Sequence, residues 1–214
     1  MTRKILILEI VLIAAALAAT ALAWPHLPAV VPTHWGINGQ PDGFSPRWHL
    51  FLIGPGIMTL ITVMTWLIPW LSPRRFSVDD FSATYRQVML MVFLLIAFIQ
   101  EFMLWSAFGH PVTGGRVMLG GACLFIALIG NLMGKVRRNF FIGVKTPWTL
   151  ASERVWNATH RFAGKTMVAG GLLGLALAIG GLEIWPIVAM MAGALAPVVY
   201  SLVLYKQLER RGEL

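Results

Sequence analysis

The sequence predicts an all-α integral membrane protein with about six transmembrane helices and both termini in the cytoplasm. Hydrophobic residues make up 57% of the chain and charged residues only 12%, and the mean hydropathy is +0.74. Several apolar runs reach the roughly 20 residues that a helix needs to cross a bilayer. In the resulting topology 15 of the 17 lysines and arginines fall on one side, which the positive-inside rule makes cytoplasmic. This placement explains the net charge of +8 without nucleic acid.

The first apolar run, residues 5–24, follows the basic residues Arg3 and Lys4. It is longer than the apolar core of a secretory signal and has no convincing cleavage site, so we expect an uncleaved first span. The remaining spans are expected at about 49–71, 85–108, 117–134, 165–181 and 185–205. Gly170, Gly174 and Ala178 recur every four residues, which favours a close helix crossing.

The loop at residues 25–48 is predicted to face outward. It is too rich in proline and glycine to span the membrane, and Asn38-Gly39 and Asp42-Gly43 are turn signals. We expect a short hairpin or compact loop that caps the bundle. His34 and Asp42 have two interpretations: they stabilise the turn by hydrogen bonding, or they supply two ligands of a zinc site. No metal site is predicted, because no HExxH motif or cysteine supports the second interpretation.

Residues 135–164, here called the cytoplasmic island, form a polar and basic segment between two apolar runs. Glu153 is its only acidic residue. Thr146 reads as a helix N-cap and Pro147 as the first helical residue. An amphipathic helix from Pro147 to about Phe162 is therefore predicted to lie along the inner bilayer surface, between the fourth and fifth spans. Its apolar face comprises Trp148, Ala151, Val155, Ala158 and Phe162, with Trp156 at the boundary between the faces.

Two motifs resemble a known family. The first comprises Asn131, Asn139, Gly143, Thr146-Pro147-Trp148-Thr149-Leu150, Val155-Trp156 and Thr159-His160-Arg161. In this order they resemble the signature of the SdpI-type bacterial immunity proteins; Val144-Lys145 stands where Ile-Arg is expected and keeps hydrophobicity and charge. The second motif is P-x-H-W-x-x-x-G-x-P-D, formed by Pro32, His34, Trp35, Gly39, Pro41 and Asp42. It resembles the N-terminal segment that often accompanies the first.

The resemblance implies a non-enzymatic, multi-pass protein of the bacterial inner membrane. It would confer resistance to a secreted peptide toxin and, in some settings, tether a cytoplasmic transcriptional repressor, with no cofactor and no direct contact to nucleic acid. Two units are expected: residues 1–115 with the outward loop, and an SdpI-like unit at 116–214 with the island.

The two motifs also supply the candidate binding residues. Toxin or ligand binding in the outward loop is assigned to His34, Trp35, Gly39, Pro41 and Asp42. Binding of a cytoplasmic partner or of lipid headgroups is assigned to Asn139, Lys145, Thr146, Pro147, Trp148, Trp156, His160 and Arg161. Lipid anchoring and protein docking both stay open for the island.

Other classes of function also have candidate residues. Glu101 is predicted deep in the third span, where an ionisable group is costly, and Asn131 lies in the fourth. Together they suggest a small proton-coupled transporter or exporter, although Glu101 also fits a structural role near the outer interface. An intramembrane zinc enzyme is the third hypothesis. Cys123 is the only cysteine, so neither an intrachain disulfide nor a thiolate cluster forms.

Overall fold

The computed structural model describes residues 2–36, 40–109 and 114–214. Within these ranges six helical segments are long and apolar enough to cross a membrane, which confirms the predicted all-α, multi-pass class. They are α1 (Thr2–Ala23), α2 with α3 (His49–Phe51 and Ile57–Leu71), α4 (Ser82–Ala107), α5 (Gly114–Met133), α7 (Glu153–Ile179) and α8 (Trp185–Arg210). The other described elements are the strands β1 (Val30–Trp35) and β2 (Pro41–Pro46), the short helix α6 (Pro147–Ala151) and three single 3-10 turns at Trp24–His26, Arg74–Phe76 and Asp79–Phe81.

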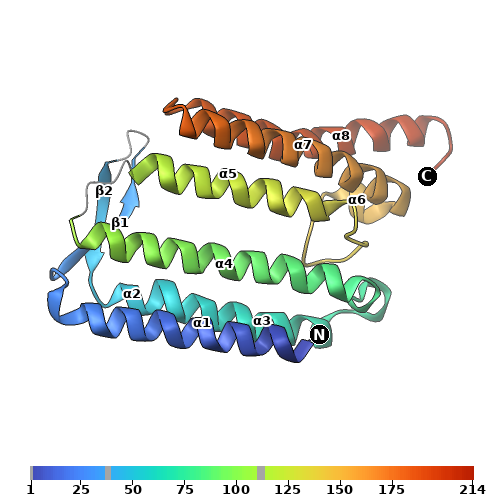
Figure 1. Cartoon of the computed structure of the whole chain (residues 1–214). Coiled ribbons are helices and arrows are strands. Elements are labelled where there is room, and N and C mark those ends of the chain that lie inside the picture. Colours follow the sequence, from blue (N-terminus) through green and yellow to red (C-terminus); the bar gives the residue numbers. More distant parts are fainter. Residues whose placement is uncertain (1, 37–39, 110–113) are drawn as a thin grey trace.

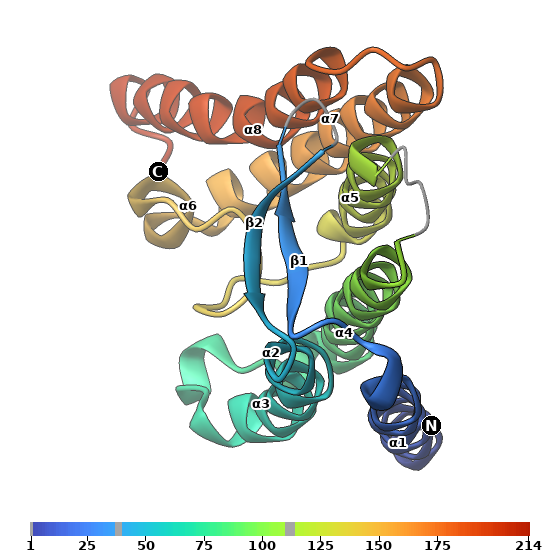
Figure 2. The same cartoon turned by 90° about the vertical axis from the view of Figure 1, so that its left-hand side faces the viewer.

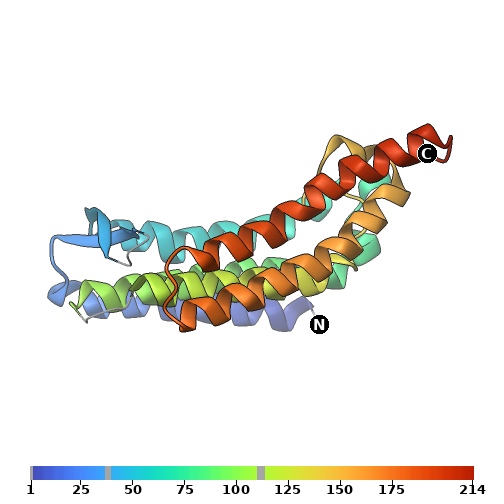
Figure 3. The ribbon, with the colours of Figure 1, turned by 90° about the horizontal axis from the view of Figure 1, so that it is seen from above.

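The two ends of the bundle differ in what they carry. Figure 1 shows the β1–β2 hairpin at one end, and both chain ends together with α6 at the other. This arrangement agrees with the predicted topology, in which the hairpin faces outward and both termini face the cytoplasm. Seen from the hairpin end, α1, α4, α5 and α7 follow one another in a curved row, with α3 beside the first two and α8 beside α7 (Figure 2). Figure 3 shows α7 and α8 tilted away from α1 toward the end that carries the termini.

The bundle therefore has two halves that meet where α4 contacts α5. At the cytoplasmic end a single apolar cluster joins them. It contains Val78, Phe81, Tyr85 and Val88 from around the start of α4, Ile129, Leu132 and Met133 from the end of α5, and Trp156, Ala163 and Met167 from α7. The hairpin end has a separate cluster of Leu27, Val31, Leu50, Met103 and Leu104. The cytoplasmic end is thus the place where the two halves are fixed to each other.

Glycines let the helices of the C-terminal half approach closely. A Cβ atom at Gly170 would lie 2.5 Å from the carbonyl oxygen of Ala189, and one at Gly174 would lie 2.9 Å from that of Pro186. Gly193 on α8 faces the carbonyl oxygen of Thr166 with no room for a side chain. The close crossing predicted from the glycine spacing is therefore confirmed, between α7 and α8.

The second span bends where the sequence places Gly54-Pro55-Gly56. Residues Leu52–Gly56 form one π-helical turn between α2 and α3, as expected where a proline removes a backbone donor. Gly54 also makes room for the side chain of Gln100 on α4, because a Cβ atom there would overlap it.

The predicted surface helix from Pro147 to Phe162 was wrong. The chain forms only the short α6 and then breaks at Ser152, whose φ of −132° and ψ of 126° are extended. The Ser152 hydroxyl accepts a hydrogen bond from the Val155 N–H and so caps a new helix, α7. That helix continues to Ile179 without a stop, since Gly164 does not end it but packs against the carbonyl oxygen of Gly130. The second part of the island is therefore the start of the fifth span.

Candidate functional site: the outer hairpin and the cytoplasmic island

The predicted outward hairpin is present. β1 and β2 pair antiparallel, with Val30 opposite Pro46 and His34 opposite Gly43, and two register shifts lie between Pro32 and Trp35. The turn residue Gly39 lies outside the described residues. Pro41 begins β2 and is half-buried.

His34 and Asp42 meet on the hairpin surface. The His34 Nδ1 and the Asp42 Oδ1 lie 2.5 Å apart, and the side chains are 74% and 53% exposed. This is the hydrogen-bonded interpretation of the pair. In the described part of the chain, no three or more His, Cys, Asp or Glu residues gather where they could hold a metal.

Trp35 attaches the hairpin to the bundle. Its ring meets the Phe102 ring of α4 edge to face, with centroids 4.8 Å apart, and it packs against the Leu27 cluster. At the base of the hairpin, the Arg47 guanidinium lies 4.3 Å from the Trp24 ring and donates to the carbonyl oxygens of Trp24 and Leu27, each at 3.1 Å. The sequence assigned Arg47 no role. Its position beside a proline-rich loop was the only feature of the sequence that could have indicated this role.

The exposed face of the hairpin is mixed in character. Phe44 and Val30 are solvent-facing apolar residues, and Trp48 follows at the base. Together with His34 and Asp42 they provide aromatic, aliphatic and charged groups on one small, anchored platform. Such a surface is suited to contact a peptide through both side-chain packing and polar pairing.

In the cytoplasmic island, Asn139 holds the loop that follows α5. It is fully buried, its amide donates to the carbonyl oxygens of Arg137 (2.7 Å) and Ile142 (3.0 Å), and its Oδ1 accepts from the N–H groups of Phe141 and Ile142, both at 2.7 Å. All of the polar capacity of the amide is used within the loop. Asn139 is therefore a positioning residue and has no free group for a partner.

His160 and Trp156 fix the loop to α7. The Val144 N–H donates to His160 Nε2 (3.0 Å), so this nitrogen carries no proton, and Nδ1 donates to the Trp156 carbonyl oxygen (2.8 Å). The rings of Trp156 and His160 stack at 4.0 Å, and the indole N–H donates to the Val136 carbonyl oxygen at 2.8 Å. Gly143 has a φ of +116° and lies against the imidazole, where no side chain fits. Trp156 is fully buried, so its predicted place at the boundary between the polar and apolar faces of a surface helix was wrong.

Thr146 is an N-cap, as predicted. Thr146 and Thr149 form a reciprocal capping box on α6, and the Thr146 hydroxyl also lies 3.1 Å from that of Ser201 on α8. Both threonines are buried. The predicted island residues that reach the surface are Lys145, Pro147 and Arg161, with Trp148 half-buried. Only these four can contact a lipid or a protein directly.

The two polar residues proposed for a transporter, Glu101 and Asn131, do not lie near each other. Glu101 lies close to the hairpin end of α4 and Asn131 close to the cytoplasmic end of α5, and both are exposed on the bundle surface. Other polar side chains are buried in the described spans, among them Glu9, which is 1% exposed and faces Thr62, and Gln100, whose Nε2 donates to Thr20 Oγ1 at 2.8 Å. Glu9 was missed because it lies only about two turns inside α1.

Comparison with known proteins covers both regions. Residues 135–202 match the SdpI/YfhL protein family, and residues 11–59 match a domain of unknown function, DUF1648. Immunity protein SdpI of Bacillus subtilis (strain 168) is 25% identical to the chain over 167 residues, which is 78% of each protein. The chain is therefore similar to an SdpI-type immunity protein over most of its length. No solved structure gives a significant match.

The two family matches cover the two regions described above, the outer hairpin and the cytoplasmic island. The DUF1648 match runs from the middle of α1 through the hairpin to the start of α3, and the SdpI/YfhL match begins at the island and ends in α8. Together with the six apolar helices, it supports a multi-pass protein of the bacterial inner membrane and an immunity-type function. It also suggests a role without catalysis.

Proposed function

We propose that this chain confers resistance to a secreted peptide toxin, with the outer hairpin as the surface that meets the toxin. The observation that carries the proposal is the similarity to Immunity protein SdpI over 78% of the chain. The hairpin supports it, because it presents exposed aromatic and charged side chains at the outer end of the bundle.

The anchoring of the hairpin is the physical basis for recognition. Trp35 on Phe102 and Arg47 on Trp24 hold both ends of the strand pair against the helices. A surface that is already ordered loses little conformational entropy on binding, so more of the contact energy appears as affinity. A peptide that reaches the outer leaflet would meet this platform before it reached the lipid-facing helices.

The cytoplasmic island is the part of the chain suited to tether a repressor. Its loop is held rigid from within by Asn139, Thr146 and His160, while Lys145, Pro147 and Arg161 reach the surface. An ordered basic loop of this kind is suited to dock an acidic surface of a cytoplasmic protein.

The test is survival of a toxin-sensitive bacterium that expresses the chain, challenged with a panel of secreted membrane-active peptides. Wild type should protect against at least one peptide. His34→Ala with Asp42→Ala should reduce the tolerated concentration about tenfold or more, whereas Glu183→Ala, an exposed carboxylate in the turn between α7 and α8, should not. Absence of protection by the wild type would reject the immunity function, and full protection by the double variant would reject the hairpin surface.

Trp35→Ala tests anchoring in the same assay. The loss of the Phe102 contact should loosen the hairpin without removing either charged group, so tolerance should fall while membrane expression stays. Unchanged tolerance would show that a rigid hairpin is not required.

A further inference from the structure

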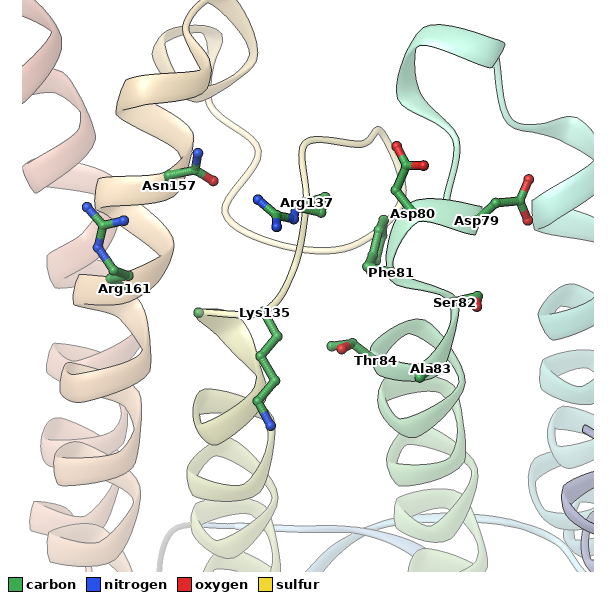
Figure 4. Close-up of a pocket in the computed structure, with 11 residues that line it drawn as sticks. Asp79, Asp80, Phe81, Ser82, Ala83, Thr84, Lys135, Arg137, Asn157 and Arg161 are labelled. Atoms are coloured by element: carbon green, nitrogen blue, oxygen red, sulfur yellow. The ribbon is translucent and has the colours of Figure 1, made fainter. Parts of the chain in front are cut away.

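A polar cleft of about 610 Å³ opens at the cytoplasmic end of the bundle. It lies between the start of α4, the end of α5 and the first turns of α7 (Figure 4). Three cations from separate segments reach it: Lys135 just after α5, Arg137 in the following loop and Arg161 on α7. Asn157, one turn before Arg161, extends its side chain toward Arg137 (Figure 4).

These cations differ from the others in the island by lacking partners. Arg154 pairs with Glu213 at 2.8 Å, Lys145 donates to the carbonyl oxygens of Phe140 and Phe141, and Arg138 donates to that of Leu150. None of those three lines the cleft. Among the residues that the structure describes, the side chains of Lys135, Arg137 and Arg161 show neither a hydrogen bond nor an ion pair. The island cations outside the cleft therefore have partners for their side chains, whereas the three cations that line the cleft do not.

The two acidic residues that line the cleft do not neutralise its three cations. Asp79 accepts a hydrogen bond from the Ser77 hydroxyl at 2.8 Å, and its carboxylate points away from the cations in Figure 4. Asp80 lies at the rim, and neither carboxylate forms an ion pair with the three cations within the described residues. Three like charges held around one cavity repel one another, so an anion in the cleft would relieve this repulsion.

The depth of the cleft indicates what kind of anion it meets. It adjoins the last turn of α5 and the first turn of α4, where the apolar spans end. In Figure 4 the Lys135 ammonium turns back along α5 toward the membrane. A lysine at a helix end has a long, flexible side chain that can also extend toward water. Phospholipid headgroups lie at this depth, and basic pockets between helices on the cytoplasmic side suit their phosphates. Guanidinium groups also match the geometry of phosphate oxygens.

We propose that the cleft binds a phosphate group, supplied by an anionic phospholipid of the inner leaflet. Arg137 and Arg161 contact the phosphate oxygens, Lys135 contributes charge from the membrane side, and Asn157 adds an amide donor. The bound lipid links α4, α5 and α7 at the place where the two halves of the bundle meet. This inference does not depend on the toxin-facing role of the hairpin.

The experiment uses the full-length purified protein and native mass spectrometry of its lipid adducts. Micelles are doped with phosphatidylglycerol or with phosphatidylcholine. The cleft variant is Arg137→Gln with Arg161→Gln, and the matched control is Arg210→Gln with Arg211→Gln, which removes the same charge from exposed positions at the same end of the molecule. Wild type and control should bind phosphatidylglycerol in preference to phosphatidylcholine, and the cleft variant should bind it roughly thirtyfold more weakly, since each cation contributes about fivefold.

Several outcomes would overturn the proposal. Equal losses in the cleft variant and the control would mean that general surface charge attracts the lipid. Unchanged binding in the cleft variant would remove the site altogether. Binding of inorganic phosphate without any preference for phosphatidylglycerol would overturn the lipid source and leave a soluble phosphate as the ligand. If the double variant does not fold, Lys135→Gln alone should weaken phosphatidylglycerol binding about fivefold, and no loss there would reject the proposal.

Discussion

The two halves of the bundle treat buried polar groups differently. In the C-terminal half, from α5 to α8, the buried Asn139, Thr146, Thr149 and His160 all have partners, and within the described residues only Thr159 has a buried side-chain oxygen without one. The N-terminal half, from α1 to α4, has many more buried atoms without partners. They belong to Trp35, Ser72, Arg86 and Gln100, while Glu9 and Thr62 face each other without a hydrogen bond of regular geometry.

The N-terminal half could therefore gain free energy if its buried polar atoms found partners, whereas the C-terminal half has little left to gain in this way. An unpaired buried polar group costs about 1–3 kcal/mol, and more in apolar surroundings. A bound partner, an ordered water or a change in helix packing could recover part of that energy in the N-terminal half. The hairpin is attached to the same half through Trp35 and Phe102.

The largest effect is expected from the tight crossing of the C-terminal half. Gly193→Ala places a methyl group against the Thr166 carbonyl oxygen and near Gly170, so it should lower the free energy of unfolding by about 3 kcal/mol. The measurement is denaturant unfolding in detergent micelles, followed by tryptophan fluorescence. Gly120→Ala is the control, because its Cβ atom would lie 3.4 Å from Leu175 and a helical alanine is favoured over glycine. Equal stabilities would show that α7 and α8 are not packed as closely as described.

A smaller loss is expected from His160→Ala. It leaves the Val144 N–H without its acceptor and removes the stacking on Trp156, which together should cost about 2 kcal/mol. Hydrogen exchange of residues 137–146 should speed up at the same time, because the loop loses its link to α7. The neighbouring Arg161→Ala is exposed and should change stability by less than about 0.5 kcal/mol. Normal protection of the loop in the His160 variant would place its anchor elsewhere.

The smallest effect should have the opposite sign. Glu9→Leu replaces a buried carboxyl that lacks a hydrogen bond of regular geometry with an apolar side chain and should stabilise the protein by about 1 kcal/mol. Glu101→Leu, at an exposed position on α4, should leave stability nearly unchanged. Destabilisation by Glu9→Leu, measured in the same unfolding assay, would show that the Glu9 carboxyl stabilises the folded protein on balance and would remove much of the contrast between the halves.

Sequence reasoning succeeded where a single physical cause dominates. The apolar runs and their basic flanks gave the six spans, because a helix that crosses lipid must be about 20 residues long and largely apolar. The turn residues at 38–43 gave the hairpin, and Thr146 before Pro147 gave the cap of α6. The expected exposure of Trp156 and His160 was wrong, because both side chains are buried under the loop that follows α5. An aromatic residue and a histidine near a membrane surface suggest exposure unless the position of such a loop is known.

The sequence by itself thus determined the class of protein, the number of spans and the two marker regions that resemble SdpI-type proteins. Only the tertiary structure decided which members of the motifs face outward. Hydrophobicity along a chain records the solvent around each segment, whereas burial of Asn139, His160 and Glu9 depends on which helix or loop lies against them. The grouping of Lys135, Arg137 and Arg161 around one cleft likewise depends on how α4, α5 and α7 approach one another. Spacing along the chain does not encode that approach.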